Sequence, residues 1–185
     1  MTHPGASDCA AVMIELMRGL RAVRQLRPDP IDDATLQRIL EVARWSGSAG
    51  NRQPWEFVVV RDRALLQQLS RIEGAVAAHL ARAAVGIAIV MHPEMPDLDG
   101  YDEGRAAERI LLAARALGLG AAVGHFTGPG VTWGASTEAK RLLRIPEALQ
   151  LRETISIGYP AEHLQKSPNP AGRKPLEQLV HWDHY

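Results

Sequence analysis

The sequence contains little cysteine, few aromatic residues and no excess of either charge. Cys9 is the one cysteine, so no disulfide can form within the chain, as is usual in a reducing cytosol. Lysine plus arginine and aspartate plus glutamate both number 21, which gives a formal net charge of zero. Non-specific binding to nucleic acids requires a cationic excess that displaces counterions. We therefore expect a cytoplasmic protein with no nucleic-acid partner.

Long apolar runs are absent as well. No stretch approaches the roughly 20 apolar residues that span a bilayer, and residues 1–11 do not resemble a secretory signal. We expect no membrane partner. His181 and His184 are spaced to share a helix face, but no set of cysteines or carboxylates stands beside them. The sequence therefore predicts no metal site.

The apolar content is sufficient for one core. Of the 185 residues, 46% are apolar and only 5% are aromatic, with alanine, leucine and valine prominent. This composition favours closely packed helices around a modest sheet, and the length suits a single domain over residues 1–185.

The spacing of the apolar residues predicts helices where they recur every three or four residues and strands where the residue types are β-prone. The predicted helices are one capped by Ser7 or Asp8, one after the N-cap Asp32, one after Asp62, a short one ending near Ala83, and two over Tyr101–Leu117 and Ser136–Leu143. The predicted strands are Trp55–Arg61, Val85–Met91, Ala121–Phe126 and Thr154–Tyr159. Prolines predict extended chain over Arg21–Ile31 and a loop over His92–Gly100. Gly118 is the expected left-handed residue after the long helix.

The C-terminal tail is rich in proline and polar residues but ends with apolar side chains, namely Leu176, Leu179, Val180 and Trp182. Such a tail is expected to dock on a surface, and a partner subunit is a suitable one.

Four segments occur in the order and spacing of signatures of the nitroreductase family, which they resemble. Residues 21–28 (RAVRQLRP) resemble its basic RRSxRxF segment, and residues 48–55 (SAGNRQPW) resemble its PSxxNxQPW loop. Residues 111–120 (LLAARALGLG) are similar to its LLAAxxLGLG helix end. Residues 157–160 (IGYP), with residues 173–177 (RKPLE) downstream, resemble its closing strand and tail. The four segments together cover nearly the whole chain.

This resemblance implies an α+β fold, with a mainly antiparallel central sheet flanked by helices, in an intertwined homodimer. It also implies two FMN sites at the subunit interface. The activity it implies is hydride transfer from NADH or NADPH, through FMN, to a small acceptor such as a nitroaromatic or a quinone. No catalytic side chain is predicted, because the cofactor carries the redox chemistry.

The phosphate of FMN favours arginine, and the candidates are Arg21, Arg24 and Arg173, with Ala22 in the same segment. By resemblance, Arg24 points at the pyrimidine edge of the flavin near N1 and O2. The sequence departs from the family pattern at Leu20, Ala22 and Ala171, where basic or hydroxyl side chains are usual. Arg27 or Lys174 are candidates to replace those contacts.

Two further segments are expected at the flavin ring. By resemblance, Gly47, Ser48 and Asn51 reach the FMN of the opposite subunit, and Asp102 faces the partner site. A backbone amide of the Val123–Gly124–His125 segment is expected at N5, with Gly124 permitting a close approach. His125 is either a proton donor to the product or a structural residue.

Three other functions stay open. One is a non-catalytic protein that binds or sequesters flavin. Another is a flavin-cleaving enzyme of the benzimidazole-synthase type, which residues 27–30 (RPDP) resemble. The third is a dimeric remnant that binds no flavin. The region around residues 73–105 is short for the family, which predicts an open or small lid and broad acceptor tolerance.

Overall fold

In the described residues, five strands form one sheet in which every strand pair is antiparallel. The computed structural model describes residues 4–72, 75–126, 137–162 and 172–185. The strands are β1 (Leu26–Arg27), β2 (Trp55–Val60), β3 (Val85–Met91), β4 (Gly120–His125) and β5 (Gln150–Pro160). The predicted α+β class with a mainly antiparallel sheet is therefore confirmed.

Strand β5 is the central strand of this sheet. It pairs with β3 along one side and with β4 along the other, and its last residues pair with β1. Strand β2 pairs with β3 and forms an edge of the sheet within the described residues. Because β3 has partners on both sides and helices over both faces, all seven of its residues are buried.

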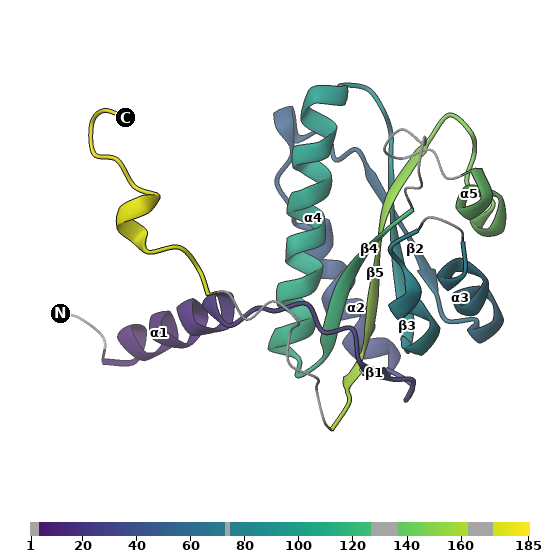
Figure 1. Ribbon diagram of the computed structural model, residues 1–185, viewed down its shortest axis with the longest axis horizontal. Helices are drawn as coiled ribbons and strands as arrows, with labels where there is room; N and C mark the ends of the chain where they lie inside the picture. Colours follow the sequence, from purple (N-terminus) through teal and green to yellow (C-terminus); the bar gives the residue numbers. More distant parts are fainter. Residues whose placement is uncertain (1–3, 73–74, 127–136, 163–171) are drawn as a thin grey trace.

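Helices cover the two faces of the sheet, with α2 and α4 on one face and α3 and α5 on the other (Figure 1). The α-helices are α1 (Pro4–Arg18), α2 (Asp33–Arg44), α3 (Arg63–Ser70), α4 (Pro96–Ala116) and α5 (Thr137–Leu143). Short 3₁₀ turns are η1 (Ala49–Asn51), η2 (Ala78–Arg82) and η3 (Leu176–Gln178).

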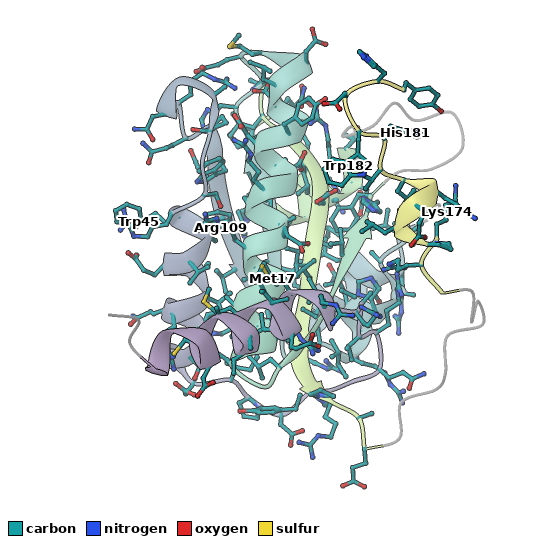
Figure 2. All side chains as sticks on the ribbon, turned by 90° about the vertical axis from the view of Figure 1, so that its left-hand side faces the viewer. Met17, Trp45, Arg109, Lys174, His181 and Trp182 are labelled. Carbon is teal, nitrogen blue, oxygen red and sulfur yellow. The ribbon has the colours of Figure 1, made fainter. Side chains whose placement is uncertain are left out.

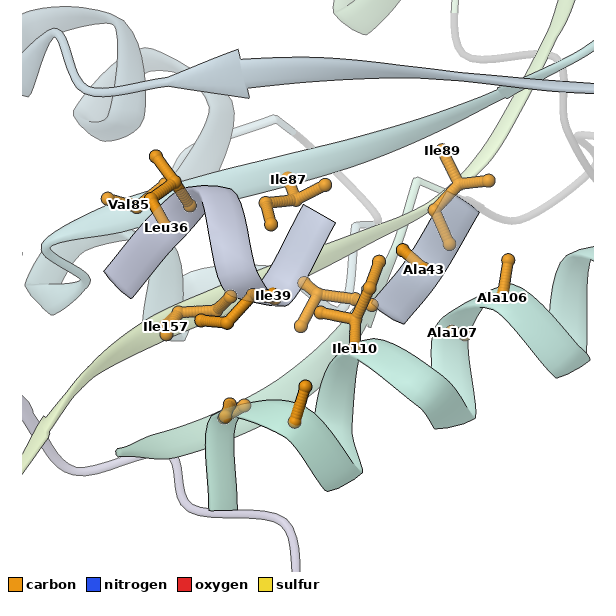
Figure 3. Close-up of a cluster of buried hydrophobic side chains, with 14 of the residues drawn as sticks. Leu36, Ile39, Ala43, Val85, Ile87, Ile89, Ala106, Ala107, Ile110 and Ile157 are labelled. Carbon is orange, nitrogen blue, oxygen red and sulfur yellow. The ribbon is translucent and has the colours of Figure 1, made fainter. Parts of the chain in front are cut away.

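The larger core lies between the sheet and the pair α2 and α4 (Figure 3). Ile39 of α2 and Ile110 of α4 are fully buried there, against alternate residues of β3 such as Ile87. Ala106 and Ala107 add little volume on the inner face of α4, so this helix can lie close to the strands. The opposite residues of β3 pack on α3 and η2 in a second core.

Several local predictions are confirmed. Asp32 accepts a hydrogen bond from the Thr35 amide at 2.8 Å, and Asp62 accepts one from the Leu65 amide at 2.7 Å, so both are N-caps. Gly118 follows α4 with a φ of +76°, in the left-handed region.

Three predicted element starts differ from the structure by more than one residue. Helix α4 begins at Pro96 rather than Tyr101, because a proline fits the first turn of a helix and the acidic side chains of that turn favour its positive end. Helix α1 begins at Pro4, so Ser7 and Asp8 lie within the helix rather than directly before it. Strand β5 begins at Gln150 rather than Thr154, since pairing with β3 extends it. Ser136 lies outside the described residues.

Helix α1 and the C-terminal tail both project from the body of the protein on the α4 side (Figures 1 and 2). Helix α1 crosses α4, where the Arg115 side chain donates a hydrogen bond to the Leu16 carbonyl at 3.0 Å. Large apolar side chains on both segments are exposed, including Val12, Met13, Ile14 and Met17 on α1 and Leu176, Leu179 and Trp182 on the tail. Within the described part of the chain, no helix combines the length and the apolar character that crossing a membrane requires.

Replacing Gly124 with alanine is expected to lower the free energy of unfolding by about 1–3 kcal/mol. A Cβ at this position would lie 2.9 Å from the Val76 carbonyl oxygen and 3.2 Å from the Ala77 Cα, so η2 would have to move. Denaturant unfolding measures the change. Gly172→Ala is the control, since no atom of the described residues lies within 4 Å of its added Cβ. Equal stabilities for the two variants would contradict this packing.

Candidate functional site

One cavity of about 730 Å³ lies where the end of α1, the extended segment after it, α4, β4 and the tail come together. It is lined by six of the ten predicted site residues, namely Arg21, Ala22, Arg24, Val123, His125 and Arg173. The predicted convergence of the two distant chain segments is therefore found in the described residues.

The lining of this cavity is strongly basic. Arg18 contributes a fourth guanidinium beside Arg21, Arg24 and Arg173, and Glu108 is the carboxyl group of this lining. Sequence reasoning missed Arg18, although its position three residues before Arg21 extends the same basic stretch. Arg21 donates hydrogen bonds to the carbonyls of Arg18 and Leu20 at 2.8 and 2.6 Å, which fixes its side chain at the end of α1. An anion in the cavity would meet an excess of positive charge.

Arg27 and Lys174, which were predicted to replace the missing phosphate contacts, do not line this cavity. Arg27 instead pairs with Asp29 at 3.4 Å and lies over the ring of Tyr159, 5.7 Å from its centroid. Lys174 is exposed on the tail. Ala171, the third departure from the family pattern, lies outside the described residues.

The outer edge of β4 presents backbone groups beside the cavity. The Ala121 carbonyl accepts from the Val23 amide at 2.8 Å, and His125 exchanges two hydrogen bonds with Val76 at 2.8 and 3.2 Å. Since hydrogen-bonding direction alternates along an antiparallel strand, the Val123 amide lies on this same edge. The His125 amide already donates to Val76, so Val123 is the residue whose amide best fits the expected contact with a ring.

Gly124 lies between Val123 and His125. The side on which a glycine gives room differs from the expected approach to a flavin ring. A Cβ there would point at Val76, Ala77 and His79 rather than into the cavity. The close packing of η2 thus accounts for this glycine in the described structure.

The predicted loop residues Gly47, Ser48 and Asn51 do not line the cavity. The loop is tightly wound, with φ values of +58° at Gly50, +57° at Asn51 and +52° at Gln53. The Ser48 hydroxyl accepts a hydrogen bond from the Gln53 amide at 2.9 Å, which closes the turn. Asparagine tolerates this left-handed conformation better than most residues.

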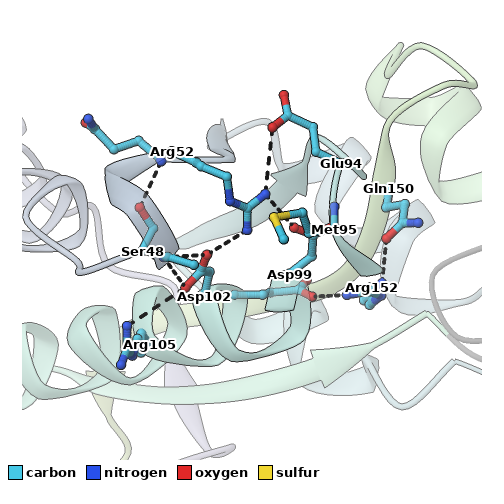
Figure 4. Close-up of polar contacts among 12 residues, drawn as sticks. Ser48, Arg52, Glu94, Met95, Asp99, Asp102, Arg105, Gln150 and Arg152 are labelled. Atoms are coloured by element: carbon cyan, nitrogen blue, oxygen red, sulfur yellow. Dashed lines mark hydrogen bonds and ion pairs between the residues drawn. The ribbon is translucent and has the colours of Figure 1, made fainter. Parts of the chain in front are cut away.

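A buried carboxylate clamp holds this loop against α4 (Figure 4). Asp102 accepts hydrogen bonds from the Ala49 amide at 3.2 Å and from Arg52 at 3.1 Å. Asp99 pairs with the same guanidinium at 3.1 Å and accepts from the Met95 amide. Both aspartates are almost fully buried, and Arg52 is 17% exposed. The position of Asp102 therefore fixes the loop within this chain.

A second acidic cluster connects α4 to the strands. Arg152 of β5 donates to Glu103 of α4 at 3.1 Å, while the other Glu103 oxygen is buried with no hydrogen-bond partner in the described residues. Burial raises the pKa of Glu103 to about 7, and repulsion from Glu153 adds to the effect. Burial also raises the pKa of Glu153, against the opposing charges of His125 and Arg152.

His79 is buried beneath β4, with Nδ1 2.7 Å from the Ser156 hydroxyl. Burial lowers the pKa of His79 to about 4, and the positive charge of Arg24 adds to this effect. Its ring is therefore neutral at pH 7. Among the described residues, no group of three or more His, Cys, Asp or Glu side chains is placed to hold a metal ion.

A larger cavity, about 1150 Å³, lies between α2 and the edge strand β2. Its lining includes Leu40, Trp55 and Phe57, and it contains none of the ten predicted site residues. The lining also contains the polar and charged residues Gln37, Arg38, Glu41, Arg44 and Gln53. A partly apolar surface beside a strand edge that has no partner in the described residues is typical of a surface that another chain covers.

Comparison with known proteins identifies the family. An Archaeoglobus fulgidus protein that carries the provisional name NADH dehydrogenase/NAD(P)H nitroreductase is 34% identical over 146 residues, covering 77% of this chain and 82% of the relative. The chain belongs to the nitroreductase family. The sequence model of the Nitroreductase family also matches residues 17–94. An oxygen-insensitive NADPH nitroreductase of Salmonella typhimurium is 27% identical, covering 93% of this chain and 74% of that enzyme.

Solved structures agree with the nitroreductase fold. An FMN-dependent nitroreductase from Clostridium difficile superposes with a TM-score of 0.78 at 24% identity, covering 93% of this chain and 99% of that one. A nitroreductase-type protein from Desulfovibrio desulfuricans, solved in complex with FMN, gives a TM-score of 0.75 at 25% identity, covering 100% and 99%.

Replacing Asp102 with asparagine is expected to reduce the free energy of unfolding by about 1–3 kcal/mol, because Arg52 and the Ala49 amide lose a buried charged acceptor. Unfolding in guanidinium chloride at pH 7 measures this change in the free energy of unfolding. Asp97→Asn, an exposed change in the first turn of the same helix, serves as the control and should cost under about 1 kcal/mol. An Asp102→Asn variant as stable as this control would show that Asp102 does not hold the loop around Ala49 and Arg52 in place.

Proposed function

We propose that this nitroreductase-family protein binds FMN between two copies of the chain and catalyses hydride transfer from NADH or NADPH to a small acceptor, such as a nitroaromatic or a quinone. The observation that carries the proposal is the single cavity in which Arg21, Arg24 and Arg173 meet the outer edge of β4.

The residues of this cavity fit FMN by their chemistry. A phosphate dianion is best held by guanidinium groups, and four arginines line the cavity. Arg18 is the natural replacement for the basic residue that the family pattern has at Leu20. The flavin ring carries donors and acceptors along its edge, for which the Val123 amide and the Arg24 side chain are suitable partners. When bound, FMN would supply the hydride-transfer chemistry.

The names of related proteins support the same activity. The Salmonella relative is named for NADPH and nitroreduction, and the Desulfovibrio structure was solved with FMN. A 5,6-dimethylbenzimidazole synthase from Rhodospirillum rubrum is 28% identical and covers 80% of this chain and 81% of that enzyme. The higher identity of the Archaeoglobus relative, 34%, favours reduction over flavin cleavage.

A homodimer would complete this site. The loop with Gly47, Ser48 and Asn51 lies apart from its own cavity, as expected if it contacts the FMN of the partner. The apolar residues exposed on the tail suit the apolar part of the cavity beside β2, which Leu40, Trp55 and Phe57 line. We propose that the tail of each copy covers this surface of the other.

Arg24→Ala and Arg173→Ala are each expected to weaken FMN binding about tenfold or more, since each removes a charge-assisted contact. Titration of protein stripped of FMN with added FMN, followed by flavin fluorescence, measures the affinity. Arg27→Ala is the matched control, because Arg27 pairs with Asp29 and Tyr159 outside the cavity.

The purified wild-type protein should be yellow and should be bleached by NADH or NADPH without oxygen. Protein that takes up no FMN would overturn the proposal. Protein that binds FMN but is reduced by neither nicotinamide would indicate sequestration, and oxygen-dependent loss of reduced FMN would indicate flavin cleavage.

The double variant Leu179→Asp, Trp182→Ser is expected to raise the dimer dissociation constant about 100-fold or more, because two large side chains would no longer be buried in the interface. Sedimentation velocity over a concentration series measures this change. Asp183→Asn, a polar change in the same tail, should leave the dimer intact. A wild-type monomer at every concentration would refute the dimer.

A further inference from the structure

Two buried polar side chains, those of Ser156 and His79, meet on the η2 side of the sheet. Ser156 of β5 is fully buried, and His79 of η2 is 8% exposed. Nδ1 of His79 lies 2.7 Å from the Ser156 hydroxyl oxygen. The same hydroxyl donates a hydrogen bond to the Ala122 carbonyl of β4 at 3.3 Å. The two contacts therefore reach from η2 to the backbone of β4.

The Ala122 carbonyl and the Val123 amide are the two ends of one peptide group, and they point in opposite directions across it. The carbonyl is directed toward β5, where Ser156 is the residue paired with Ala122. The Val123 amide is therefore directed toward the outer edge of β4, where the Ala121 carbonyl and the His125 amide make their hydrogen bonds. Val123 lines the cavity, and among the described residues no backbone hydrogen bond outside the sheet uses its amide. This amide is thus presented to a ligand.

The direction of the hydrogen bonds follows from the donors available. A serine hydroxyl has one hydrogen to donate, whereas Nδ1 of a neutral histidine either donates or accepts. The Ala122 carbonyl only accepts, so Ser156 makes both contacts at once when its hydrogen points to Ala122 and the His79 Nδ1–H donates to its oxygen. Nε2 of His79 is buried with no hydrogen-bond partner among the described residues. A hydrogen on Nδ1 therefore leaves no buried ring donor without a partner.

The surroundings of His79 keep its ring neutral. Burial lowers its pKa to about 4, and the positive charges of Arg24 and His125 add to this effect. The Val123 carbonyl opposes the fall in the pKa, although no hydrogen bond joins it to Nε2. A neutral ring carries one hydrogen, as the assignment to Nδ1 requires.

We propose that His79 and Ser156 are positioning residues that act through the Ala122–Val123 peptide group and make the Val123 amide a stronger hydrogen-bond donor toward N5 of FMN. This proposal rests on the proposed function. Each hydrogen bond in a chain polarises the next, so a bond to the carbonyl strengthens the amide of the same peptide group. The contacts also fix the orientation of the peptide plane. The site thereby favours a ring with an acceptor atom at this position over a ring of the same shape without one.

The test compares FMN with 5-deaza-FMN, in which a C–H group replaces the N5 acceptor with little change in the shape of the ring. Fluorescence titration of protein stripped of FMN measures both dissociation constants. Wild-type protein should bind FMN about fivefold or more tightly than 5-deaza-FMN. Ser156→Ala should reduce this ratio to about twofold, because the Val123 amide is less polarised. A wild-type ratio near one, or an unchanged ratio in Ser156→Ala, would overturn the proposal.

Thr154→Val is the matched control. Thr154 is a buried residue of the same strand, and its hydroxyl donates to the Ile87 carbonyl of β3, also at 3.3 Å. Its replacement removes a similar hydrogen bond without touching the peptide group of Val123, so the ratio should remain that of wild type. An equal loss of the ratio in both variants would indicate a general loosening of the sheet and would overturn the specific role of Ser156.

Two variants of His79 separate hydrogen bonding from the filling of space. His79→Asn keeps an N–H donor near the place of Nδ1, whereas His79→Leu fills the buried space without a donor. Asparagine should retain the wild-type ratio of the two dissociation constants, and leucine should lower it as Ser156→Ala does. The opposite order would overturn the role of His79.

A measurement on FMN-free protein provides a readout that needs no flavin. The ¹⁵N resonances of the wild-type His79 ring should show the hydrogen on Nδ1 near neutral pH. The ¹⁵N resonance of the Val123 amide should move upfield in Ser156→Ala and stay in place in Thr154→Val. A hydrogen on Nε2 would overturn the proposal, and this holds even if Ser156→Ala does not fold. Wild-type protein that takes up no FMN would refute the proposed function, whereas uptake with an unchanged ratio in Ser156→Ala would refute this role alone.

Discussion

The antiparallel hydrogen bonding on both sides of β5 is the constraint on which the rest of the structure depends. It fixes β4 beside Glu153, and it fixes β1, and therefore the chain leading to it, at the far end of the same strand. The side chains of a strand alternate between its two faces, so a slip of one residue in β4 would turn His125 away from the cavity and Gly124 toward it. The register between β4 and β5 therefore decides which side chains face the cavity, in addition to the identity of those side chains.

Much of this arrangement follows from local sequence. The N-caps Asp32 and Asp62 were predictable because the capping residue and its amide partner are three residues apart. The cation cluster was predictable only through resemblance, since no local rule connects Arg21 with Arg173. The beginning of α4 was missed because proline and glycine were interpreted as loop residues, although a proline at the first helical position is favourable.

The contacts that sequence reasoning missed join residues that are distant along the chain. Asp102 holds a loop that precedes it by about fifty residues, and spacing alone does not indicate such pairs. Arg52 stood within a loop of small residues, next to the predicted Asn51, and two acids lie three residues apart on α4. Arg52 has no acidic residue beside it in the sequence of this turn, and this was the available indication that its partner lies elsewhere in the chain. Gly124 was predicted to permit a close approach of a ring, whereas in the structure Val76, Ala77 and His79 pack against it. The short helix ending near Ala83 was predicted, but its contact with Gly124 was not.

The cavity receives its positive charges from opposite ends of the polypeptide, and this has a thermodynamic consequence. A dianion bound by Arg21 and Arg173 together would close a loop that contains almost the whole chain, as a reversible cross-link does. The ligand would have to order the segments that carry these guanidinium groups, so part of the contact energy would be offset by lost chain entropy. Occupancy of the cavity and the positioning of both chain ends would then be a single linked equilibrium.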